Sequence, residues 1–145
     1  MKKVDRRKKV KAHIRRKGEN CDFEITESFA LYWWHLLNDV IFDGYLTPPA
    51  GFEIKNFRDC GGWCRPHQWN RLNQPYERRV KIGLLREYWD RKTFLIVLAH
   101  EMVHQWEWEI DADWNTRVEH GKSFFAWKNK IKYRTGLPLD RTVDL

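Results

Sequence analysis

Phe94-Leu-Ile-Val-Leu-Ala-His-Glu-Met-Val-His104 is the stretch that decides the fold of this 145-residue chain. Its first six residues are apolar on every side of a helix, which predicts a helix buried on most faces. Asp90 stands where it can cap this helix, which we expect to run to about Glu109. The stretch ends in an H-E-x-x-H motif, in which two histidines four residues apart share one helix face.

That spacing suits a bound metal ion. His100 and His104 lie about 6 Å apart along the helix axis, so both imidazoles can reach one Zn²⁺. Glu101 follows the first histidine, and its carboxylate emerges beside the ion rather than on it. A carboxylate in that place can take a proton from an attacking water molecule.

A catalytic zinc site needs a third protein ligand and one open position. The spacing H-E-x-x-H-x-x-G-x-x-H is excluded, because Glu107 and Ile110 stand where Gly and His are required. His120, sixteen residues after His104, is a candidate, and Glu119 beside it is the main competitor. The other acidic candidates are Glu107, Glu109, Asp111 and Asp113.

The flanking segments predict an α+β fold. Thr26 can cap a helix over residues 27–42, and Gly44 can end it. A last helix follows Gly121 and stops at Gly136. Between these helices lie three expected strands, one over residues 51–57, one that opens at residues 61–64 and one over residues 79–83. The expected order is an N-terminal helix, a small three-stranded sheet, the active-site helix and a C-terminal helix.

Composition narrows the class of protein further. One domain is expected at this length, and 42% hydrophobic residues are too many for a disordered chain. No apolar run approaches the roughly 20 residues that span a membrane, and no signal peptide is recognisable. Three cysteines are too few for a disulfide framework. We therefore expect a monomeric cytoplasmic or nucleoid-associated protein without membrane contact.

The net charge of +7 is concentrated at the N-terminus, since residues 1–17 alone carry ten Lys/Arg and one Asp. This suggests a basic arm, residues 1–18, that binds DNA (single-stranded or duplex) or RNA, ahead of a domain over residues 19–145. The other interpretation is a solubility tail, or a basic strand or helix on the body's surface with a weak apolar edge from Val4, Val10 and Ile14. The candidate nucleic-acid contacts are Lys2, Lys3, Arg6, Arg7, Lys8, Lys9, Lys11, Arg15, Arg16 and Lys17.

Residues 24–136 resemble the SprT-like (Spartan-type) metalloprotease domain. Besides the H-E-x-x-H motif, the resemblance rests on His120-Gly-Lys-Ser-Phe124, Leu37-Asn-Asp-Val-Ile-Phe-Asp-Gly-Tyr-Leu-Thr-Pro-Pro49, Gly61-Gly-Trp-Cys64 and Val80-Lys-Ile82. The chain differs from the longer members because it ends at Leu145 without a cysteine-rich zinc ribbon.

The resemblance implies a zincin-like fold and a zinc-dependent peptidase with a protein substrate. It implies that His100, His104 and His120 bind Zn²⁺ and that Glu101 is catalytic. Relatives cleave proteins trapped on DNA, which implies DNA as a partner. The alternatives are a non-catalytic, zinc-containing nucleic-acid-binding module and a hydrolase of a non-peptide substrate such as a cell-wall amide.

Cys60, Cys64 and His67 fit a second zinc site poorly and are expected to be ordinary strand residues. The oxyanion-stabilising group is not identified, and its candidates are Tyr133, Arg117 and Lys122.

Eight of the nine tryptophans divide into two expected groups. Trp33, Trp89 and Trp127 fit a core. The others are harder to bury together, and any exposed near the active helix are suited to stack on bases or to hold apolar substrate side chains. For each of these, packing is the simpler expectation. They are Trp63, Trp69, Trp106, Trp108 and Trp114.

Overall fold

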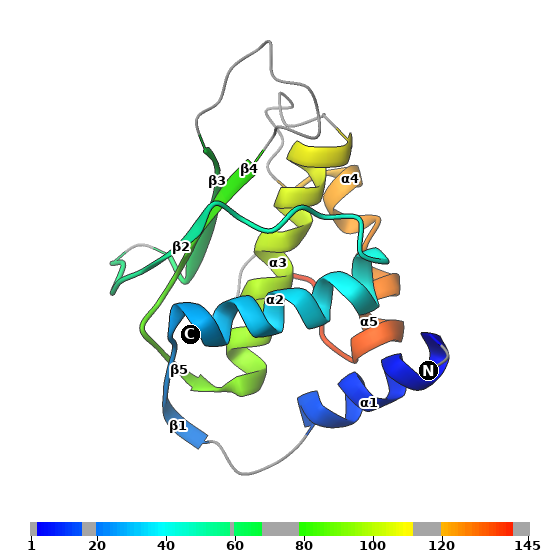
Figure 1. Cartoon of the computed structure of the whole chain (residues 1–145), viewed down its shortest axis with the longest axis horizontal. Coiled ribbons are helices and arrows are strands. Elements are labelled where there is room, and N and C mark those ends of the chain that lie inside the picture. The colour runs from blue at the N-terminus through cyan, green and yellow to red at the C-terminus, as the bar shows by residue number, and fades with distance from the viewer. Residues whose placement is uncertain (1–2, 16–19, 59, 68–78, 112–119, 141–145) are drawn as a thin grey trace.

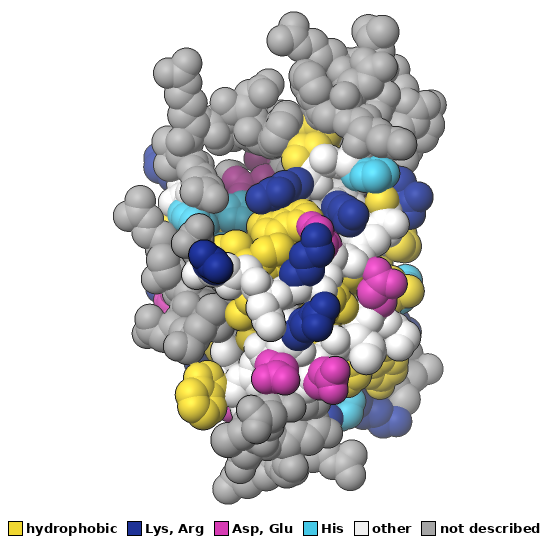
Figure 2. All heavy atoms as spheres, turned by 90° about the vertical axis from the view of Figure 1, so that its left-hand side faces the viewer, with side chains coloured by type: hydrophobic (Ala, Val, Ile, Leu, Met, Phe, Trp, Pro, Cys, Tyr) yellow, Lys and Arg dark blue, Asp and Glu magenta, His cyan; other side chains and the backbone are white. Residues whose placement is uncertain are grey.

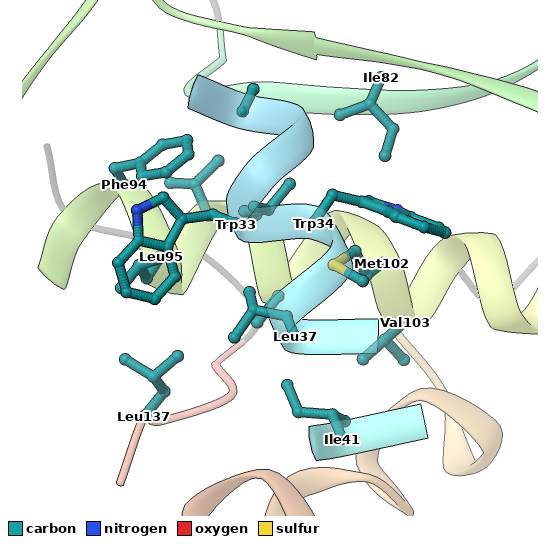
Figure 3. Packing of buried hydrophobic residues seen from close by; sticks show 14 of the residues in the cluster. Trp33, Trp34, Leu37, Ile41, Ile82, Phe94, Leu95, Met102, Val103 and Leu137 are labelled. Atoms are coloured by element: carbon teal, nitrogen blue, oxygen red, sulfur yellow. The ribbon is translucent and has the colours of Figure 1, made fainter. Parts of the chain in front are cut away.

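Two buried helices, α2 (Glu27–Phe42) and α3 (Arg91–Trp106), cross at the centre of the molecule (Figures 1 and 3). Each begins at the predicted cap, because the Thr26 hydroxyl accepts from the Phe29 amide at 3.2 Å and the Asp90 carboxylate accepts from the Thr93 amide at 2.8 Å. The computed structural model describes residues 3–15, 20–58, 60–67, 79–111 and 120–140.

The three-stranded sheet lies on one side of α3. It has the order β2 (Gly51–Ile54), β4 (Arg79–Leu84), β3 (Gly62–His67), with β2 parallel and β3 antiparallel to β4. The central strand is the most apolar, and Val80, Ile82 and Leu84 are fully buried. β3 is an edge strand and packs directly against α3.

The core is built around α2. Trp33 and Trp34 are consecutive and both fully buried, because they leave the helix on opposite sides (Figure 3). Trp34 lies on the side of Ile82 and Met102, whereas Trp33 lies on the side of Phe94 (Figure 3). Two large indoles therefore fill both sides of the crossing between α2 and α3.

Two short strands were not predicted, and a helix over the basic N-terminal segment was expected only as the alternative to a basic arm. Strands β1 (Asn20–Glu24) and β5 (Glu87–Asp90) form a separate antiparallel pair. Helix α1 (Lys3–Arg15) packs on α2, α3 and α5. These short or charge-rich segments lack the apolar periodicity from which an element can be read.

The remaining differences concern element ends. β2 stops at Ile54 rather than residue 57, and α3 continues beyond Trp106 as a π-helical turn, Glu107–Asp111. The last helix is divided into α4 (Lys122–Phe125) and α5 (Lys128–Thr135), since the Trp127 amide donates to the Phe124 carbonyl and tightens the chain there. Gly136 ends α5 with φ 81°, as predicted.

The expectation that Trp89 lies in the core is wrong. On β5 it is Tyr88 that faces inward, so the next residue points outward, and Trp89 is 64% exposed. Conversely, Trp108 is buried and Trp106 packs against the core. The α+β class with a small three-stranded sheet is confirmed. Among the described residues, no helix combines the length and apolar character needed to cross a membrane.

Candidate metal centre and active site

Three histidines meet at the C-terminal half of α3. His100 and His104 lie one turn apart with ring centroids 5.1 Å apart, and His120 arrives from the segment just before α4. The Nε2 atom of His120 lies 3.1 Å from that of His100 and 3.3 Å from that of His104. One ligand atom from each residue lies within 4.8 Å of the other two, which is close enough to hold one metal ion.

Phe124 forms the apolar wall behind the three imidazoles. It is fully buried on α4, and its ring centroid lies 4.7–4.8 Å from each histidine ring. A rigid ring in contact with all three imidazoles restricts their tilt. The last turn before α4 and Phe124 therefore fix His120 against α3.

The other nitrogen of each α3 histidine decides its tautomer. His100 Nδ1 lies 3.1 Å from the Asp140 carbonyl oxygen, and His104 Nδ1 lies 3.1 Å from Glu107 Oε1. Both partners are hydrogen-bond acceptors, so each Nδ1 carries the ring proton and donates a hydrogen bond. Each Nε2 then presents a lone pair towards the shared centre, which is the form that binds a metal ion.

Burial reinforces this arrangement. Desolvation, followed by the neighbouring His104 and His120, lowers the pKa of His100 to about 3. The imidazole is therefore neutral at physiological pH and available as a ligand. Three converging imidazoles, of which His100 is buried and the other two are half-buried, fit a divalent cation.

Glu107 is a residue whose role was not found in the sequence. Its Oε1 accepts from His104, and its Oε2 accepts from the Ser123 hydroxyl at 2.5 Å. It thus supports a histidine from behind rather than lying among the three Nε2 atoms. The sequence did place Glu107 three residues after His104, a spacing at which two helix side chains can interact. Because the same spacing is common between exposed helix residues, it did not identify this role.

Glu109 serves a different purpose. The π-helical turn directs its carboxylate to the loop after α2, where Oε1 accepts from the Thr47 amide at 2.6 Å and Oε2 accepts from Gln105 at 2.9 Å. Burial raises its pKa. Of the other acidic candidates for the third ligand, Asp111 is exposed, and Asp113 and Glu119 lie outside the described residues.

Glu101 is buried between α3 and the edge strand β3. A Cβ atom added to Gly62 of β3 would lie 2.8 Å from Val97 Cγ1 and 3.6 Å from Glu101 Cγ. Burial, and secondarily the charge of Glu101, raises the pKa of the Cys64 thiol on the same strand. Glycine at position 62 therefore lets the strand approach the Glu101 side chain closely.

The second zinc site has no support within the described ranges. There, the three histidines are the one group of His, Cys, Asp and Glu side chains close enough to share an ion. Cys60 and Cys64 are free cysteines. Among the oxyanion candidates, Tyr133 and Lys122 are exposed on α5 and α4, and Arg117 lies outside the described residues.

The basic segment forms helix α1 on the surface of the body. Val10 and Ile14 are buried, and the Arg6 guanidinium contacts both Asp39 oxygens at 2.8 Å. Arg7 pairs with Asp43 at 3.3 Å. Lys8 and Lys9 are exposed, and Lys11 donates to the Tyr133 carbonyl at 3.4 Å.

The other candidate cations are described less fully. Only the backbone of Lys3 and Arg15 is described, and Lys2, Arg16 and Lys17 fall outside the described residues.

Comparison with curated proteins finds no match for this sequence. A family model does match, that of the SprT-like family, over residues 30–143. The matched region contains the His-Glu-x-x-His helix, His120 and the whole three-stranded sheet. The chain belongs to the SprT-like family.

Proposed function

We propose that this chain is a zinc-dependent peptidase with a zincin-like active site, in which His100, His104 and His120 hold the ion. The observation that carries the proposal is the convergence of three imidazole nitrogens within 4.8 Å beside a buried glutamate. Membership of the SprT-like family supports the same reaction class. Zn²⁺ bound there supplies Lewis-acid polarisation of a carbonyl and acidifies water.

Glu101 is the proposed acid and base of the reaction. Its carboxylate removes a proton from the attacking water while the oxygen bonds to the scissile carbonyl carbon, and it returns that proton to the leaving nitrogen as the C–N bond breaks. Burial excludes bulk water from this carboxylate and strengthens its interactions. A purely structural zinc site has no need of a buried carboxylate next to its ligand, so Glu101 favours an enzyme over a binding module.

The test is whether cleavage depends on zinc. Zinc-loaded protein, chelator-treated protein and chelator-treated protein with zinc restored are each incubated with an unfolded protein substrate, and fragments are resolved on a gel. We expect cleavage by the first and third samples only. Zinc-loaded protein that leaves the substrate intact would contradict the proposal.

We propose that the enzyme acts on proteins at or near DNA. Support comes from the charge of α1, whose Lys8 and Lys9 are exposed while Arg6 and Arg7 pair with acidic residues of α2 and its C-cap. Helix α5 packs beside α1 and adds Lys128, Lys130 and Lys132, all exposed. Lysines on adjacent helices suit contacts to a phosphate backbone.

A further inference from the structure

In the part of the chain that the structure describes, one face of the three-stranded sheet is turned away from the core. Side chains alternate along each strand, so Phe52, Val80, Ile82 and Leu84 fill the core while their neighbours point outward. The register places Trp63 opposite Gly83 and Arg65 opposite Lys81 on this outer face. Figure 2 views the molecule from the sheet side and shows Lys and Arg side chains gathered around exposed hydrophobic surface.

Trp63 lies flat on this face. A Cβ atom added to Gly83 would be 2.1 Å from Trp63 Cε2 and 2.3 Å from its Nε1, so the indole covers the glycine of the neighbouring strand. Phe57 meets the indole edge to face, with centroids 5.9 Å apart. The Arg65 guanidinium carbon lies 4.4 Å from the indole centroid. The sheet therefore presents a fixed flat ring with an exposed guanidinium stacked on it.

The charge around this ring is positive. Arg65 of β3 is exposed and Lys81 of β4 is half-buried. Neither β3 nor β4 brings an acidic residue to the outer face. Glu53 of β2 lies opposite Gly83, and Lys55 neutralises it with an ion pair of 2.8 Å. Arg79 is partly engaged, because it donates to the Pro48 and Pro49 carbonyls.

We propose that this outer face binds single-stranded DNA, with an unpaired base stacked on the Trp63–Arg65 pair and the adjoining phosphates contacting Lys81 and Arg65. Flat aromatic rings and guanidinium planes both stack on bases, and neighbouring cations pair with the backbone. Duplex DNA keeps its bases inside the helix and cannot offer a base to a ring lying on a sheet. The inference rests on the proposed association with DNA and adds a second surface to that of α1.

The position of this surface bears on the proposed reaction. The inner side of β3 carries Gly62, next to Glu101, and its outer side carries Trp63. DNA held on the outer side would be separated from the proposed catalytic carboxylate by the β-strand β3. A protein attached to or bound near that DNA would then be held at the edge strand that borders Glu101.

The test is a binding titration on the full-length, zinc-loaded protein with a fluorescein-labelled oligo-dT and with a duplex of the same length. Trp63→Ala is compared with Trp63→Phe, which keeps a stacking ring, and with Trp89→Ala, which removes an exposed tryptophan from β5. We expect Trp63→Ala to weaken oligo-dT binding about tenfold and duplex binding little, while the other two stay near wild type. Melting temperature and zinc content establish that each variant is folded.

Arg65→Ala/Lys81→Ala provides a second variant if Trp63→Ala does not fold, and it should weaken oligo-dT binding and flatten its salt dependence. Unchanged oligo-dT affinity in the folded variants, or equal losses for oligo-dT and duplex, would overturn the proposal. A third result would also overturn the proposal: variants that bind oligo-dT normally but cleave an unfolded protein more slowly in the absence of DNA. That result would mean that the outer face binds the protein substrate. Because the titration requires no proteolysis, it is independent of whether the chain is a peptidase.

Discussion

The second nitrogen of His104 determines how firmly that residue is held for metal binding. Glu107 Oε1 accepts a hydrogen bond from this nitrogen at 3.1 Å. Glu107 Oε2 accepts one from the Ser123 hydroxyl at 2.5 Å, which orients the carboxylate. A carboxylate behind a ligand histidine fixes the tautomer and increases the basicity of the coordinating nitrogen. Ser123 and Phe124 are adjacent on α4, so this short helix supports His104 by hydrogen bonding and by packing.

Glu107→Ala is therefore expected to lower zinc affinity about 10- to 100-fold, whereas Glu107→Gln, which keeps an acceptor oxygen, should lower it less. Competition with a chromogenic chelator measures the zinc dissociation constant of each variant. Glu87→Ala, an exposed glutamate on β5, is the matched control. A dissociation constant for Glu107→Ala equal to that of Glu87→Ala would mean that Glu107 does not support the site.

Single residues also show what the sequence could reveal about the site. His100, Glu101 and His104 were recognisable because a helix brings residues four apart together without any tertiary information. His120 needed the additional motif that it begins. The carbonyl of Asp140, which holds His100, has no sequence signature, because any residue there offers the same oxygen.

At the scale of elements, the C-terminal end of α3 is tied to the loop after α2. The Gln105 side chain accepts from the Trp34 indole at 3.0 Å and donates to the Thr47 carbonyl at 2.7 Å and to Glu109 at 2.9 Å. Gln105 lies in α3 just before the π-helical turn, and within that turn Glu107 contacts His104 and Glu109 contacts Thr47. The turn thus links the histidine site to the first core helix.

Gln105→Ala should destabilise the fold by about 2 kcal/mol or more, because it leaves the buried Trp34 N–H and Thr47 carbonyl without partners. Urea unfolding of the zinc-free protein measures this without a contribution from the metal. Asn129→Ala, an exposed amide on α5, should change the free energy of unfolding by less than about 0.5 kcal/mol. Equal unfolding free energies for the two variants would remove the proposed role of Gln105.

Element prediction succeeded where the apolar pattern was long. Helices α2 and α3 each repeat their buried positions over several turns and carry a recognisable cap, so their starts were correct. Strands β1 and β5 are five and four residues long, and their pairing joins segments more than sixty residues apart. Such a pairing depends on the tertiary fold, which single-sequence periodicity does not contain.

At the scale of the whole molecule, the basic N-terminal segment packs against the rest of the domain as helix α1. Val10 and Ile14 are buried in the core, and the His13 ring stacks on Trp33 with centroids 4.7 Å apart. Removing residues 1–17 would expose Trp33 and leave Asp39 and Asp43 without the arginines of α1. A truncation would therefore change stability and charge together.

Lys8→Glu/Lys9→Glu separates the two effects, because both lysines are exposed. We expect this variant to keep the wild-type melting temperature, to bind DNA more weakly and to show a flatter dependence of affinity on salt. Arg86→Glu/Lys92→Glu makes the same charge change at exposed positions outside α1 and should bind DNA more tightly than the first variant. Equal DNA affinities for the two variants would show that α1 has no specific part in binding.

The most direct test of the central claim compares wild type with Glu101→Gln at equal zinc content. The substitution keeps the shape of the side chain and removes its ability to accept a proton at neutral pH. Cleavage of an unfolded protein is followed over time, with bound zinc measured in the same samples. We expect Glu101→Gln to retain one zinc per chain and to lose cleavage by about 100-fold or more. A variant that cleaves at the wild-type rate would contradict the assignment of Glu101 and the proposed active site.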